Sequence, residues 1–181
     1  LYAGANNTEL CPTTAFDSSS LYLPNQQPTA QEIQHRVEKY WQPYHQAITD
    51  TIMQLKHQYN KVVLLDAHSI LAQVPRFFSG TLPDFNFGSA DGTSCDEQLL
   101  TNIEKINLVP YTSVFNGRFK GGYITRAYGV PSNNVHAIQL ELSQRTYMDE
   151  PSSHYNEQKA SKVKVQLKNF VQSLVDFAQE K

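Results

Sequence analysis

The sequence predicts an α/β fold in which helices flank the faces of a mixed β-sheet. Two short apolar segments, 62–65 and 135–142, have the character of strands. Three longer segments carry apolar residues at intervals of three and four, which is the period of an amphipathic helix. Such a mixture of strands and helices indicates a sheet with helices packed on it. The 181 residues, of which 40% are hydrophobic, suit a single domain with one core.

The N-terminal quarter divides into an irregular segment and a helix. Residues 1–27 are rich in Asn, Ser, Thr, Pro and Gln and show no sustained period, which is typical of an irregular surface segment. A helix is predicted from a capping box at Thr29 to about residue 59, and Pro43 is expected to kink or divide it. Beside this break, His45 can approach a metal or substrate, or pack as a helix histidine on aromatic side chains. The second interpretation is favoured.

The first predicted strand leads into a group of polar residues. Four apolar residues, 62–65, indicate a short strand that is buried on both faces. It ends in Asp66-Ala67-His68-Ser69, and open α/β sheets place their ligand sites at the carboxyl ends of strands. His68 therefore lies where an imidazole can bind a metal or move a proton. A histidine that only forms local hydrogen bonds explains this segment equally well.

The remaining elements follow from the same patterns. We expect a long connection over residues 70–93 and a helix over about 96–107. A strand over 111–115 and a β-rich run over 123–125 come next. A final amphipathic helix over 153–180 is expected to pack on the sheet and to take no part in chemistry.

Glu141 lies in the second predicted strand and favours a functional interpretation of His68. Residues 135–142 alternate, so that Gln139 and Glu141 share one face and leucines occupy the other. A carboxylate on such a strand is costly to bury unless it has a partner or a function. A strand-end His and a strand-borne Glu are typical of a metallohydrolase, in which they act as metal ligand and general base. His136 can orient Glu141 or have a structural role, and both alternatives stay open.

Three cations lie close together in the segment between these elements. Arg118, Lys120 and Arg126 fall within nine residues, after the turn pair Asn116-Gly117. Charged residues at a turn are usually solvated, but arginine also grips carboxylates in a bidentate fork. The segment is therefore either a solvated turn or an anion clamp.

Composition limits the partners and the location of the protein. A net charge of −2 gives no reason to expect nucleic acid or an anionic membrane as partner. No apolar run approaches membrane-spanning length, and no signal-peptide pattern opens the chain. Cys11 and Cys95 form no CxxC pair, which indicates reduced thiols in a cytoplasmic protein. Neither thiol lies beside a recognisable base, so neither is expected to be catalytic.

Several linked motifs resemble one family. They are the segments 65–70 (LDAHSI), 75–80 (PRFFSG), 82–84 (LPD), 91–95 (DGTSC), 116–126 (NGRFKGGYITR) and 137–142 (AIQLEL). Together they resemble the N-formylglutamate amidohydrolase (N-formylglutamate deformylase) family of zinc carboxypeptidase-like hydrolases. The resemblance covers most of the chain.

The resemblance implies a fold, a reaction and roles for particular residues. The fold would be carboxypeptidase-like (phosphorylase/hydrolase-like), and the reaction the hydrolysis of N-formyl-L-glutamate to formate and L-glutamate in histidine degradation. One zinc ion would be held by His68, and Glu141 would act as general base. Arg118, Arg126 and Asn116 would bind the small dianionic amino-acid substrate.

The resemblance also implies a longer protein. The chain begins with Leu1, and the family's remaining metal ligands are expected in a preceding N-terminal part that this chain lacks. Residues 1–181 are therefore expected to be the C-terminal portion of a larger domain. Two alternatives remain open: another N-acyl-amino-acid amidohydrolase or carboxypeptidase-like enzyme, and a non-catalytic binding domain without the N-terminal metal ligands. The sequence does not indicate an oligomeric state.

Overall fold

The computed structural model describes residues 9–180, which form two compact units. The smaller unit contains the described residues up to Thr51 together with Gln73–Gly80, and the larger unit contains Ile52–Ala72 and the chain from Thr81 onward. Helices are present together with strands that pair in both parallel and antiparallel fashion, so the predicted class, α/β with a mixed sheet, is confirmed. Among the described helices, none combines the length and the apolar character needed to cross a membrane.

The start of the smaller unit is irregular, as predicted for the part of residues 1–27 that the structure describes. Residues 1–8 lie outside the described chain. A single bridge joins Thr14 to Ser20, and the Asp17 carboxylate accepts hydrogen bonds from the backbone and hydroxyl of Ser19. The Arg76 guanidinium donates to the Ala15 carbonyl at 2.5 Å.

The first predicted helix is confirmed as three consecutive helical segments. They are α1 (Ala30–Arg36), the π-helix η1 (Val37–Trp41) and α2 (Gln42–Gln58). The Thr29 hydroxyl accepts from the Glu32 amide at 3.2 Å and caps the start. The π-turn ends at Trp41, two residues before Pro43. Because proline has no N–H to donate, the helix widens there and continues, and this is a known response to a break in the hydrogen-bond pattern.

The larger unit is built on a four-stranded mixed sheet. Its strands are β1 (Val62–Ile70), β2 (Phe85–Gly88), β3 (Ser113–Phe115) and β4 (Val135–Ser143), in the order β1-β4-β2-β3. β1 and β4 are parallel, β4 and β2 are antiparallel, and β2 and β3 are parallel. A second, two-stranded sheet pairs β5 (Met148–Asp149) with β6 (His154–Tyr155). The 3₁₀ turn η2 (Pro131–Asn133) precedes β4, η3 (Gln144–Thr146) joins β4 to β5, and η4 (Glu150–Ser152) joins β5 to β6.

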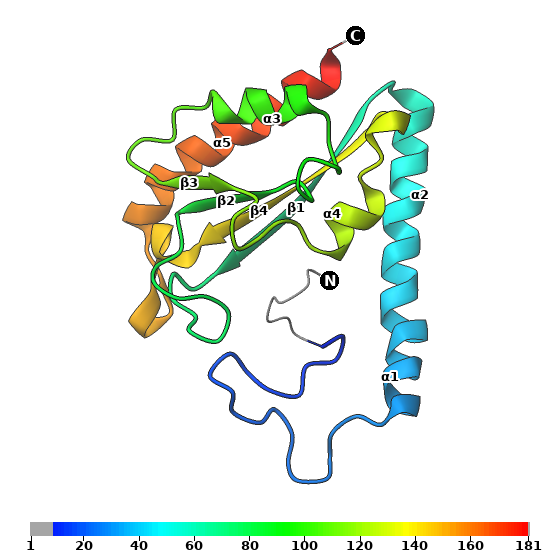
Figure 1. Cartoon of the computed structure of the whole chain (residues 1–181), viewed down its shortest axis with the longest axis vertical. Coiled ribbons are helices and arrows are strands. Elements are labelled where there is room, and N and C mark those ends of the chain that lie inside the picture. The colour runs from blue at the N-terminus through cyan, green and yellow to red at the C-terminus, as the bar shows by residue number, and fades with distance from the viewer. Residues whose placement is uncertain (1–8, 181) are drawn as a thin grey trace. The chain divides into compact units, whose positions relative to one another are not determined.

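The two faces of the four-stranded sheet differ in chemistry. The apolar face packs against α3 (Glu97–Glu104) and α5 (Glu157–Gln179), with α4 (Tyr123–Tyr128) against the opposite face (Figure 1). The apolar core joins the sheet to both helices and includes Phe85, Phe87, Leu99, Ile103, Ile138, Leu140, Leu142, Val163, Phe170, Leu174 and Phe177. We call the other side the polar face; it presents alternate residues of β1 and β4, including Asp66, His68, Gln139 and Glu141.

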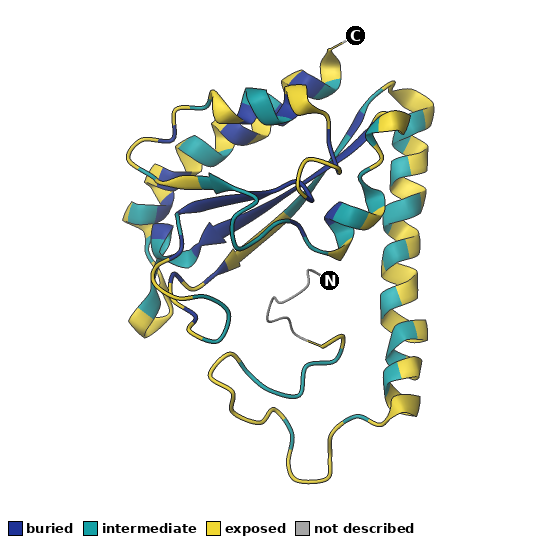
Figure 2. Ribbon diagram, viewed as in Figure 1, coloured by how far each residue is buried: buried dark blue, intermediate teal, exposed yellow. Residues whose placement is uncertain are grey.

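Three details of the sequence prediction were wrong. The connection predicted over 70–93 contains β2, a strand of four residues that is too short to show a period. The run at 123–125 begins helix α4, because Gly121 and Gly122 turn the chain there and tertiary contacts override the β-propensity of these residues. β1 runs to Ile70, so residues 66–69 lie within the strand and not beyond its end, and of the four apolar residues 62–65 only Val62 is fully buried. Figure 2 shows β4 dark blue throughout, whereas residues 67–69 of β1 are exposed.

Candidate active site

The structure brings the predicted metal ligand and the predicted base side by side. In the register of the parallel pair, His68 of β1 lies opposite Glu141 of β4, and Asp66 lies opposite Gln139. Neighbouring strands are about 4.8 Å apart, and partners in register point to the same face. His68 and Glu141 therefore share the polar face, although they are far apart in the sequence.

The His68 ring is oriented by a carboxylate. Its Nε2 lies 2.8 Å from Asp66 Oδ1, in a hydrogen bond between two residues of the same strand face. This hydrogen bond raises the pKa of His68, burial opposes the rise, and the charges of Asp66 and Glu141 add to it. The Asp66 side chain is 10% exposed and the His68 side chain 50%. With Nε2 bound to Asp66, Nδ1 is the ring nitrogen that can contact a ligand.

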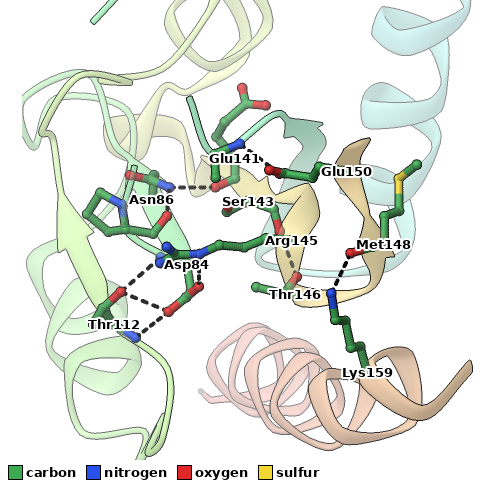
Figure 3. Close-up of polar contacts among 12 residues, drawn as sticks. Asp84, Asn86, Thr112, Glu141, Ser143, Arg145, Thr146, Met148, Glu150 and Lys159 are labelled. Carbon is green, nitrogen blue, oxygen red and sulfur yellow. Dashed lines mark hydrogen bonds and ion pairs between the residues drawn. The ribbon is translucent and has the colours of Figure 1, made fainter. Parts of the chain in front are cut away.

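Glu141 is a buried carboxyl group whose proton affinity suits acid–base chemistry. It is 7% exposed, and burial raises its pKa to about 7; the charge of Asp66 also raises it, while His68 lowers it. Within the described residues, neither carboxylate oxygen accepts a hydrogen bond. Figure 3 shows the side chain pointing away from the polar network that its own backbone carbonyl joins. A general base works best with a pKa near the working pH, which Glu141 provides.

A rigid polar network lies behind Glu141 (Figure 3). The Asn86 amide donates to the Glu141 carbonyl at 3.0 Å and to the Pro83 carbonyl at 2.8 Å. Asp84 accepts from the backbone and hydroxyl of Thr112, both at 2.9 Å, and forms an ion pair with Arg145 at 2.9 Å. These bonds fix β2 against β4 and hold the Glu141 backbone in place. No sequence pattern predicts this network, because its members are scattered along the chain.

The side chains of the cationic segment already make contacts within the protein. Arg126 Nη1 donates to the Gly121 carbonyl at 2.6 Å, and Lys120 pairs with Asp91 at 3.0 Å. The Arg118 guanidinium lies 5.4 Å from the centre of the Phe119 ring, which is a cation–π distance. Arg126 belongs to α4 and therefore to the element that lies on the polar face.

Asn116 holds a neighbouring loop. Its Oδ1 accepts from the amides of Ser89 and Asp91, at 2.9 and 3.4 Å, and its Nδ2 donates to the Ser89 hydroxyl at 2.8 Å. In this loop Ala90 and Asp91 have positive φ, a conformation that a non-glycine residue adopts only when its surroundings impose it. An amide group has two N–H donors, so one Nδ2 hydrogen remains for a ligand.

The other candidate histidines and the cysteines have structural surroundings. His136 lies on the apolar face, accepts from the Asp96 amide at 3.1 Å and packs edge-on against Phe177, so it does not orient Glu141. His45 lies 4.1 Å from the Trp41 ring, which supports the aromatic-packing interpretation. Burial raises the pKa of the Cys95 thiol to about 12, and this keeps the thiol protonated and unreactive.

The described residues fit part of a metal site. His68, oriented by Asp66, has the arrangement of a metal-ligating histidine with its supporting carboxylate. Catalytic zinc sites generally use three protein ligands. Between residues 9 and 180, however, no group of three or more His, Cys, Asp or Glu side chains is placed to hold a metal ion.

Comparisons with known proteins agree on one family. A family model described as N-formylglutamate amidohydrolase matches residues 1–148. Two N-formylglutamate deformylases, from Pseudomonas putida and Pseudomonas aeruginosa, are each 41% identical over 184 residues; the matches cover 100% of this chain and 68% and 69% of theirs. The crystal structure of N-formylglutamate amidohydrolase from Ralstonia eutropha JMP134 is similar with a TM-score of 0.68 and 26% identity. That match covers 82% of this chain and 56% of the other, so the chain spans little more than half of that protein.

Proposed function

Because the chain belongs to the N-formylglutamate amidohydrolase family, we propose that it carries the general base and one metal ligand of an enzyme that hydrolyses N-formyl-L-glutamate to formate and L-glutamate. The observation that carries this proposal is the register of β1 and β4, which sets His68 beside Glu141 on the polar face. The names of the relatives support the substrate. The carboxypeptidase-like form of the fold, the role in histidine degradation and the cytoplasmic location stay predictions from the resemblance.

Glu141 would move the proton that the reaction requires. As a carboxylate it takes a proton from the attacking water, whose oxygen bonds to the formyl carbon. The carbon–nitrogen bond then breaks, and the same carboxyl group delivers the proton to the leaving nitrogen. A pKa of about 7 lets Glu141 both accept and release the proton near neutral pH. The products are formate and the amino acid.

His68 would hold a divalent metal ion, expected to be zinc. Its Nδ1 is the atom that would bind the ion, and the hydrogen bond from Nε2 to Asp66 would keep the ring in place. When bound, such an ion polarises the formyl carbonyl and lowers the pKa of water to about 7. Further ligands would come from outside residues 9–180, in which no three His, Cys, Asp or Glu side chains are grouped to hold a metal ion.

Arg118 and Arg126 would bind the two carboxylates of the substrate. A dianion requires more than one cation, and an arginine can form two parallel hydrogen bonds to each carboxylate. Asn116 would add its remaining Nδ2 hydrogen and keep the 89–91 loop in shape. Removing one charged hydrogen bond costs about 1.5–3 kcal/mol, so Arg126→Ala should raise KM roughly 10- to 100-fold.

The test is a deformylase assay on the intact protein together with its metal content. We expect hydrolysis of N-formyl-L-glutamate, about one metal ion per chain, and loss of both in His68→Ala. A substitution of His68 that leaves stoichiometric metal in place would exclude it as a ligand. Faster cleavage of N-acetyl or peptidyl substrates would instead indicate a related N-acyl-amino-acid amidohydrolase. No metal and no hydrolysis in the intact protein would indicate a binding domain.

A further inference from the structure

Gln139 is a buried polar residue that the proposed reaction does not use. It is 5% exposed and lies on the polar face of β4, two residues before Glu141. Burying an amide without a hydrogen bond costs free energy, so a buried glutamine normally has a partner. Here Gln139 Oε1 accepts from the Gly122 amide at 2.5 Å. Gly122 is the N-cap of α4 and forms no side-chain cap of its own.

The contact reaches residues that hold Arg126. The Arg126 backbone amide donates to the Gly122 carbonyl at 3.3 Å, and its guanidinium donates to the Gly121 carbonyl at 2.6 Å. Both of these acceptors belong to the short stretch that Gln139 fixes. The Arg126 side chain is therefore bonded to the same stretch of backbone that binds to β4.

Two glycines allow the stretch to lie directly on the sheet. Gly88 of β2 pairs in register with Gln139, and a Cβ on Gly88 would lie 2.4 Å from the Gly121 nitrogen, closer than any real contact. Gly121 itself has φ +112°, a conformation that side chains disfavour. The backbone at 121–122 is thus seated against β2 and β4 at the point where Gln139 projects.

The contact also adjoins the group that orients His68. A Cβ on Gly122 would lie 3.3 Å from Gln139 Oε1 and 3.9 Å from Asp66 Oδ2, so Gly122 sits over both side chains. We propose that Gln139 is a positioning residue: by holding Gly122 it sets the place of Arg126 relative to Glu141 and His68, and so determines how tightly the substrate carboxylate at Arg126 is bound. This inference rests on the proposed function for the role of Arg126.

A kinetic cycle in the intact, metal-loaded protein tests the inference. Gln139→Leu removes the acceptor at similar size, and Gln98→Leu is an exposed control. Loss of one hydrogen bond should raise KM for N-formyl-L-glutamate about 3- to 10-fold in Gln139→Leu, with a smaller change in kcat. Gln98→Leu should match wild type.

The second half of the double-mutant cycle introduces Gln139→Leu into the Arg126→Ala variant. There Gln139→Leu should add little to KM, because the residue that it positions is gone. An equal rise in KM with and without Arg126 would overturn the proposal. So would a fall in kcat alone, which would place Gln139 with the reacting groups instead.

Amide hydrogen exchange gives a readout that needs no activity. Gln139→Leu should speed exchange at residues 122–126 and leave the Leu99–Ile103 turns of α3 unchanged. Unchanged exchange at 122–126, or equal acceleration in both regions, would overturn the positioning role. An inactive wild type would overturn the proposed function, whereas this measurement would still decide whether Gln139 holds the start of α4.

Discussion

The two faces of β4 are equally buried but differ in chemistry, and this difference separates stability from function. Ile138, Leu140 and Leu142 join the apolar core, whereas Gln139 and Glu141 occupy the polar face. Burial of apolar groups stabilises the fold, and burial of an ionisable carboxyl group costs free energy. In β4 the apolar burial on one face therefore offsets the free-energy cost of burying a reactive carboxyl group on the other.

The largest expected effect is on catalysis by the polar face. Loss of a general base typically costs about 10²- to 10⁴-fold in rate, so Glu141→Gln in the intact protein should lower kcat by that range. Metal content and thermal stability should stay close to wild type. Glu104→Gln, an exposed change on α3, serves as the matched control. If kcat per folded molecule is unchanged in Glu141→Gln, then the carboxylate is structural and the comparison of the faces fails.

The apolar face should respond in stability and not in chemistry. Phe170 of α5 is fully buried and its ring lies 5.1 Å from that of Phe87. Phe170→Ala should lower the free energy of unfolding by about 3–5 kcal/mol, through lost burial and the cavity that remains. Val171→Ala, the exposed neighbour on the same helix, should change it by less than about 0.5 kcal/mol. Urea unfolding measures both, and equal effects would contradict the assigned core.

The pH dependence of the free energy of unfolding tests how much the buried, ionised Glu141 destabilises the fold. Its pKa rises to about 7 on folding from an ordinary 4.5, so the folded state binds this proton more tightly than the unfolded state. The stability that protonated Glu141 contributes to the folded state is fully present below pH 4.5, and it is lost as the pH rises to 7. Without metal, Glu141→Gln should therefore exceed wild type by on the order of 2–3 kcal/mol at pH 8 and equal it near pH 4.5. Urea unfolding of chelator-treated protein at the two pH values measures this difference. A constant difference would rule out titration of Glu141 in this range.

The smallest effect belongs to a histidine on the apolar face. Burial lowers the pKa of His136, whose Nδ1 must stay unprotonated to accept from Asp96. A lowered pKa means that the unfolded state takes up the proton first, so wild type should lose stability as the pH falls below 6.5. His136→Gln should flatten this slope in the same unfolding series. A slope that persists in the variant would assign it to another group.

The sequence by itself determined the elements that carry the candidate site. The apolar run before Asp66 predicted β1, and the alternation around Glu141 predicted β4 and the side of the strand on which Glu141 lies. Helical periods predicted α3, α5 and the run from Ala30 to Gln58. These signals are local, because the period of a strand or helix is set by backbone geometry over a few residues.

Only the tertiary structure decided how these elements meet. The pairing of His68 with Glu141 joins strands that lie far apart in the chain, and no local pattern specifies that register. The helical start at Tyr123 depends on Gly122 binding to Gln139, which overrides the local preference for a strand. Long-range hydrogen bonds and packing determine such contacts, and the local sequence around each residue does not predict them.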